Sequence, residues 1–171
     1  MDHKRDEVLI TKVNRLLEIA FPPEKCSSQV VYNLERAELE PEMFQLQNRY
    51  KNITWKELSP DMIVRPIDSI LLLTKDAFLK MVPAYLSFAI APSSPEFNRD
   101  DRNEVCEILN FRIPASAKDL EESDYDWWNS LNHLQRTAVQ IAITAALIDE
   151  PWRLGKSLKV FAGNCVLEQA G

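Results

Sequence analysis

The stretch Leu131–Ile148, LNHLQRTAVQIAITAALI, carries the clearest helical pattern of the chain. The side chains that we expect to face the core are Leu134, Ala138, Ile141, Ala142, Ala145 and either Leu147 or Ile148. Several of them are small, which lets neighbouring helices approach closely. The pattern therefore predicts a long helix at the centre of the core, ended by Pro151.

Amphipathic helices are predicted on the N-terminal side of this stretch. The first, Asp6–Ala20, has Val8, Leu9, Val13, Leu16, Leu17 and Ala20 at helical spacing, and Phe21-Pro22-Pro23 stops it. Thr74 is the expected cap of another, whose apolar stripe is Ala77, Phe78, Met81, Val82, Tyr85, Leu86 and Ile90. A shorter helix over Asp101–Leu109 turns Val105, Ile108 and Leu109 inward.

Weaker signals predict further helices. A serine, Ser27 or Ser28, is suited to cap one that turns Val30, Val31 and Leu34 inward. Others are predicted over Trp55–Leu58 with Thr54 as cap, over Ser59–Leu73 and over Leu154–Leu167. For the second of these, a short buried strand over Ile70–Leu73 is the alternative.

Glycine is scarce, with three residues in 171 against a usual share of about 7%. Hairpin turns and bulges draw on glycine for positive φ, so the chain has little means of building a many-stranded antiparallel sheet. We therefore expect an all-α fold, an orthogonal assembly of about six to eight helices in one domain over residues 1–171. The clearest loop, at 92–101, is the place for a subdomain break.

Charge, targeting signals and cysteine spacing limit the classes of partner and the cellular compartment that we expect. A net charge of −6 argues against nucleic acid and against an anionic membrane surface. The segment Met1–Glu7 has charges of both signs and no apolar stretch follows it, so no signal peptide is predicted. Cys26, Cys106 and Cys165 lack the spacing of a disulfide framework or a zinc site. These features indicate a cytoplasmic protein.

Motifs that carry chemistry are largely missing. Gly155-Lys156-Ser157 ends like a P-loop, but Glu150 stands where the loop needs its first glycine. The two histidines, His3 and His133, have no metal-ligand or triad spacing around them. Paired carboxylates such as Glu35 and Glu38 fit a solvated acidic face better than a metal site. No cofactor and no metal are predicted.

An acidic stretch beside two tryptophans is the feature best suited to binding. Its candidate partner-binding residues are Asp119, Glu122, Asp124, Asp126, Trp127 and Trp128. In one interpretation, the acids steer a basic protein and the indoles anchor it. In the other, one or both tryptophans fill the core while the acids are solvated, since tryptophan is usually much buried.

The order of short apolar motifs resembles a family of small bacterial helical domains of unknown function. The motifs are Ala20-Phe21-Pro22-Pro23, Trp55-x-x-Leu58, Thr74-x-x-Ala77-Phe78, Pro83-Ala84-Tyr85-Leu86 and Leu131-x-x-x-Gln135-Arg136. The similarity covers roughly residues 10 to 150. It implies a helical bacterial cytosolic domain with no catalytic residues to carry over, and some similar acidic domains look like the immunity proteins that accompany bacterial toxins.

Three functions are compatible with these residues. The first is a binding protein, immunity-like in form, that takes a basic protein partner through the acidic aromatic surface. The second is an enzyme whose site is assembled from scattered carboxylates with Arg136 or His133, which requires a deep pocket. The third is a structural module that self-associates into a homo-oligomer. The sequence favours them in that order, and a non-catalytic role over a catalytic one.

Overall fold

Helices dominate the part of the chain that the computed structural model describes, residues 7–33, 35, 40–64, 72–112 and 126–149. In chain order they are α1 (Glu7–Ala20), α3 (Pro41–Tyr50), the 3-10 helix η1 (Trp55–Glu57), α4 (Pro60–Val64), α6 (Lys75–Ile90), α7 (Arg99–Arg112), α8 (Asp126–Asn129) and α9 (His133–Asp149). Extended pairing within these residues is limited to one isolated bridge between Val31 and Leu73. With seven α-helices described, the predicted all-α class is confirmed.

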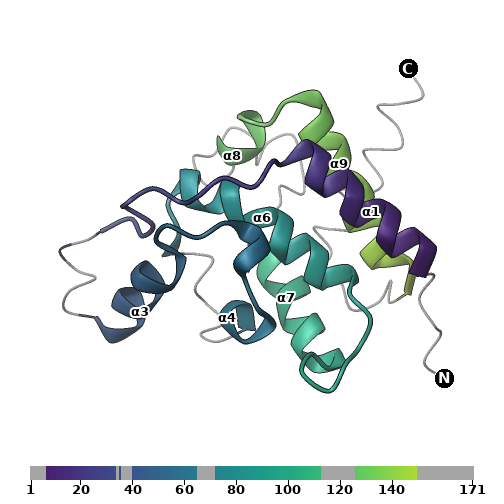
Figure 1. Cartoon of the computed structure of the whole chain (residues 1–171), viewed down its shortest axis with the longest axis horizontal. Coiled ribbons are helices and arrows are strands. Elements are labelled where there is room, and N and C mark those ends of the chain that lie inside the picture. The colour runs from purple at the N-terminus through teal and green to yellow at the C-terminus, as the bar shows by residue number, and fades with distance from the viewer. Residues whose placement is uncertain (1–6, 34, 36–39, 65–71, 113–125, 150–171) are drawn as a thin grey trace.

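Helix α6 lies at the centre of the arrangement and packs against α1, α7, α8, α9 and η1 (Figure 1). It begins where the sequence indicates, because the Thr74 hydroxyl accepts a hydrogen bond from the Ala77 backbone N–H at 3.2 Å. Its whole predicted apolar stripe is buried. The sequence pattern assigned the central position to Leu131–Ile148, and this prediction is wrong: α6 holds it, with ten of its 16 residues buried.

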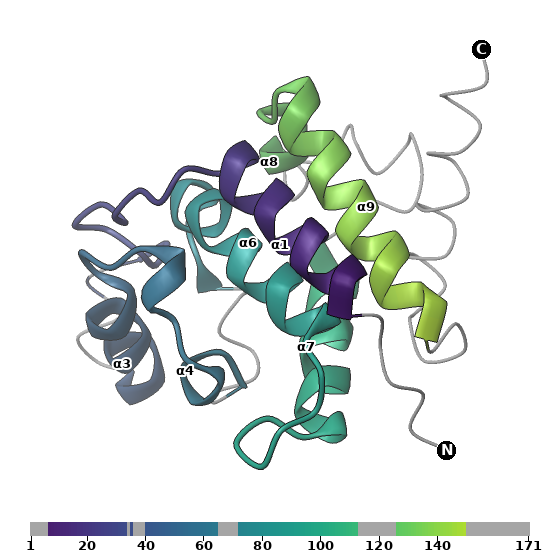
Figure 2. The same cartoon turned by 45° about the vertical axis from the view of Figure 1, so that its right-hand side comes forward.

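Helices α1 and α9 lie side by side and run in opposite directions (Figure 2). The core-facing side of α9 is Ala138, Val139, Ala142, Ile143 and Ala146. Two residues expected there point outward instead, Leu134 at 43% and Ile141 at 40% exposure. The error has a physical reason: a helix that is apolar on most sides does not reveal from its pattern which side is covered. On α1, Val8 likewise lies outside the core, at 60% exposure.

The predicted helix at Ser27 or Ser28 is wrong over the described residues up to Asn33, which include no helix. Val30 and Val31 are buried, and their backbone N–H groups both donate to the side-chain oxygen of Gln47 on α3, at 2.8 and 3.1 Å. Val31 also pairs with Leu73 in the isolated bridge. Tertiary hydrogen bonds have taken the place of helical ones, which no local pattern reveals.

The loop between α6 and α7 joins two helices that pack on each other. The Phe88 and Phe97 rings lie 5.3 Å apart, and the Arg102 guanidinium donates to the Ala91 carbonyl at 2.9 Å. One hydrophobic core contains residues from both sides of this loop, such as Ile90 and Val105. The single-domain organisation and the subdomain break at 92–101 stay predictions, and Leu154–Leu167 lies outside the described residues.

None of the helices in the described part of the chain combines the length and the apolar character that crossing a bilayer requires.

Candidate functional site

The structure describes three of the six residues that the sequence grouped as a partner-binding surface. Asp119, Glu122 and Asp124 lie outside the described residues, and Asp126 is exposed at the start of α8. The two tryptophans are buried, Trp127 at 1% and Trp128 at 6% exposure.

Both indoles take part in the core, as the second interpretation of the sequence expects. The Trp127 Nε1–H donates to the Arg112 carbonyl at 2.7 Å, and its ring packs against Phe78 at 4.8 Å. The ring centroids of Trp128 and Trp127 lie 5.7 Å apart. The Arg136 guanidinium lies 5.9 Å from the centroid of the Trp128 ring. These two side chains therefore offer little aromatic area to a partner.

Arg136 and His133 also bear on the enzyme hypothesis. Besides its position at Trp128, the Arg136 side chain donates to the Asn129 carbonyl at 3.2 Å. His133 is exposed at the first position of α9. Neither residue lines the hollows described below.

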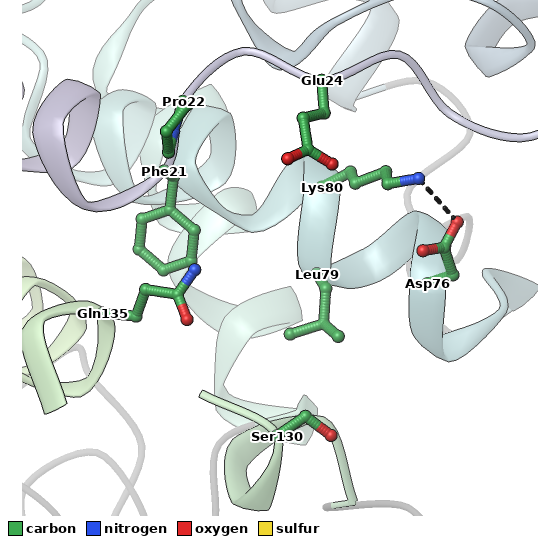
Figure 3. Close-up of a pocket in the computed structure, with 8 residues that line it drawn as sticks. All are labelled: Phe21, Pro22, Glu24, Asp76, Leu79, Lys80, Ser130 and Gln135. Atoms are coloured by element: carbon green, nitrogen blue, oxygen red, sulfur yellow. Dashed lines mark hydrogen bonds and ion pairs between the residues drawn. The ribbon is translucent and has the colours of Figure 1, made fainter. Parts of the chain in front are cut away.

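A hollow of about 210 Å³ lies where the end of α1 meets α6 and the start of α9 (Figure 3). We call it the junction hollow. Its lining residues come from three distant stretches of sequence: Phe21, Pro22 and Glu24 after α1, Asp76, Leu79 and Lys80 on α6, and Ser130 and Gln135 around the start of α9. The Ala20-Phe21-Pro22-Pro23 motif thus supplies one wall, with the Phe21 ring beside the Gln135 side chain (Figure 3).

Charged groups gather on one side of the junction hollow. The Lys80 ammonium pairs with the Asp76 carboxylate at 3.0 Å, a spacing of one helical turn on α6. Glu24 is exposed, and its carboxylate lies on the same side of the hollow as Lys80 (Figure 3). Two carboxylates against one ammonium leave this side of the hollow negative, while Phe21 and Leu79 make the other side apolar.

The position of Gln135 in the hollow is fixed by reciprocal hydrogen bonds at the start of α9. Its side-chain oxygen accepts from the Asn132 N–H at 3.0 Å, and its own N–H donates to the Asn132 side chain at 2.9 Å. Pro22, an apolar residue of the lining, is exposed to solvent.

A second hollow, of about 360 Å³, lies between α1, η1 and α6. Its apolar lining includes Trp55, Leu58 and Phe88, and the Trp55 Nε1–H is already bonded to the Phe21 carbonyl at 3.0 Å. An ion pair between Lys56 and Glu18 at 2.8 Å lies at its edge.

Buried reactive groups and metal ligands add no further site within the described residues. Cys26 is buried, and desolvation raises the pKa of its thiol to about 11, which keeps it protonated and unreactive at neutral pH. No group of three or more His, Cys, Asp or Glu side chains in the described part of the chain is placed to hold a metal ion.

Comparison of the chain with protein-family models, curated proteins and solved structures finds no match. The junction hollow is therefore interpreted from its own geometry. Sequence reasoning missed it because its residues share no local motif; the one signal was the proline-stiffened turn after α1 with Glu24 directly behind it.

Proposed function

We propose that this protein is a non-catalytic module that binds a basic protein partner at the junction hollow. The observation that carries the proposal is that one hollow combines apolar side chains with excess negative charge in its lining. Pro22, Glu24, Asp76 and Lys80 together form what we call the junction surface.

The chemistry of the junction surface fits a cationic side chain. An arginine or lysine of the partner would lay its methylene groups on Phe21 and Leu79 and place its charge against Glu24. Pro22, exposed in the same lining, would supply apolar contact beside that anchor. A net charge of −6 adds long-range attraction for a basic protein. An immunity-like role, with a basic toxin as partner, is one form of this function.

The size of the junction hollow favours a protein side chain over a small substrate. Sites for small molecules usually enclose about 300–1,000 Å³, and this hollow has about 210 Å³. The carboxylate-based enzyme, the second hypothesis from the sequence, relies on Arg136 or His133, which lie elsewhere. A partner's side chain is therefore the better-fitting occupant.

The proposal is tested by affinity capture of the tagged full-length protein from its native host. Captures are run at roughly 0.05 M and roughly 0.3 M salt, because exposed charges are increasingly screened over this range. Wild type is compared with Glu24→Lys and Pro22→Asp at the junction surface. The matched control is Glu42→Lys, the same change of charge at an exposed position on α3, away from the hollow.

Wild type and Glu42→Lys are expected to capture the same basic protein in stoichiometric amount, less of it at the higher salt. Glu24→Lys and Pro22→Asp are expected to weaken that binding at least about tenfold, as replacing an anchor residue usually does. Equal capture by all four proteins would place the interface elsewhere. Recovery of the bare protein at both salt concentrations would contradict the proposal altogether.

A further inference from the structure

The outward side of α9 carries four residues in one row, Leu134, Thr137, Ile141 and Thr144. They follow one another at steps of three and four residues, which places them on one face of a helix. Leu134, Ile141 and Thr144 are exposed and Thr137 is half-buried. We call this row the outer face of α9.

The outer face is apolar despite its two threonines. The Thr137 hydroxyl donates to the His133 carbonyl at 2.9 Å, and the Thr144 hydroxyl donates to the Gln140 carbonyl at 2.8 Å. Each hydroxyl is thereby occupied within the helix, and the threonine methyl group is left for outside contacts. None of the four residues is ionisable, and the neighbouring Arg136 packs on Trp128.

Large and small side chains alternate along the outer face, so the same row read in the opposite direction has a small side chain wherever the first has a large one. When two such helices lie antiparallel with a twofold axis at the level of residue 139, Leu134 of one copy faces Thr144 of the other. Thr137 of one copy then faces Ile141 of the other. Each large side chain meets a small one in all four contacts, as interlocking helix surfaces require.

We propose that the outer face of α9 binds the outer face of a second copy of this chain in that antiparallel register. Charge supports this occupant. Two copies with a net charge of −6 repel each other at charged surfaces, and this uncharged face lets them meet without placing like charges together. Leu134 to Thr144 spans about 15 Å along the helix, so the interface is small and we expect a weak dimer that dissociates at micromolar concentrations or above.

The test is sedimentation equilibrium of the full-length chain from about 1 μM to about 500 μM, a range that brackets such an affinity. The wild-type mass is expected to rise with concentration from 19.7 kDa toward twice that value. Thr137→Glu and Ile141→Lys are each expected to stay monomeric. The matched controls Gln45→Glu and Gln45→Lys, at an exposed position on α3, are expected to dimerise like wild type.

The register is tested by mixing the two variants in equal amounts. Because position 137 of one copy faces position 141 of the other, Thr137→Glu with Ile141→Lys forms a heterodimer with one glutamate–lysine pair. Dimer mass is therefore expected to return in the mixture and to fall again at high salt. Thermal unfolding midpoints equal to that of wild type would show that both variants are folded.

A wild-type chain that stays monomeric over the whole range would overturn the pairing, as would dimers that both single variants leave intact. A mixture that stays monomeric would overturn the antiparallel register. The outcome is separate from that of the partner proposal, because the junction surface and its variants lie at the end of α1 and on α6. A monomer that still captures a basic protein would remove the second-copy proposal alone.

Discussion

Trp127 meets Phe78 edge-on, with ring centroids 4.8 Å apart and ring planes at 80°. Phe78 also meets the Arg112 guanidinium, 5.1 Å from its centroid, and the Arg112 carbonyl accepts the Trp127 Nε1–H. Phe78 of α6, Arg112 of α7 and Trp127 of α8 thus each contact the other two. This arrangement explains why a tryptophan directly after an acidic stretch belongs to the core rather than to a binding surface.

Replacing Trp127 with alanine is therefore expected to lower the free energy of unfolding by about 3–5 kcal/mol, the usual cost of removing a large buried aromatic ring. Urea unfolding followed by circular dichroism measures it. Asp126→Ala, at the exposed neighbouring position, is the control and is expected to change stability by no more than about 0.5 kcal/mol. Comparable small effects of both substitutions would contradict the core assignment of Trp127.

The Tyr50 and Tyr85 hydroxyls, 2.9 Å apart and buried between α3 and α6, form a second test of the core. The Tyr50 hydroxyl also lies 3.1 Å from the Met62 carbonyl. Each single change to phenylalanine leaves the other hydroxyl short of one bond and is expected to cost about 1–3 kcal/mol. The double variant is expected to cost clearly less than the two single changes together, because it removes both members of the pair. Additive costs from urea unfolding would show that the two hydroxyls do not stabilise each other.

Local sequence signals predicted the helices whose start is fixed by a capping residue close to it in the chain. Thr74 marks the start of α6, and Thr54 marks η1, where both its N–H and its hydroxyl donate to Glu57, at 2.7 and 2.8 Å. In each case the cap and the helix it starts lie within four residues. The apolar stripe of α6 follows from its spacing, and the structure confirms it.

The sequence pattern could not reveal contacts between segments that lie far apart in the chain. The covered side of α9 depends on where α1 and α6 lie, and the extended segment at Val30 depends on the Gln47 side chain. The junction hollow joins Glu24, Lys80 and Gln135 through packing alone. A single sequence carries no local record of such contacts, whereas the acidic stretch before Trp127 is conspicuous because it is local.

The Gln47 side chain is expected to matter more for stability than an ordinary surface glutamine. It is 8% exposed, and its amide accepts from the Val30 and Val31 N–H groups and donates to the Ser28 carbonyl. Gln47→Leu keeps the size but leaves these buried groups without that partner, so we expect a loss of about 2–4 kcal/mol.

Urea unfolding measures that loss, with Gln45→Leu as its control, the same substitution at an exposed position of the same helix. Hydrogen exchange at the Val30 and Val31 amides gives a local readout and is expected to accelerate in Gln47→Leu relative to Gln45→Leu. Unchanged exchange at both amides would show that Gln47 does not hold this segment.

Stability is expected to fall in alkaline solution through Cys26. Burial raises the pKa of its thiol to about 11 in the folded protein, whereas an exposed thiol has a pKa of about 8.5. The folded state therefore holds the proton more tightly, and this stabilisation is complete below pH of about 8.5 and is lost as the pH rises to about 11. Between pH 7 and pH 10, the wild-type free energy of unfolding is expected to drop by about 2 kcal/mol more than that of Cys26→Ala. Urea unfolding of both proteins at the two pH values measures the difference, and the lysines and tyrosines that also titrate there affect both alike. Parallel declines would mean that the Cys26 thiol ionises in the folded protein as easily as in water, which its burial among apolar side chains argues against.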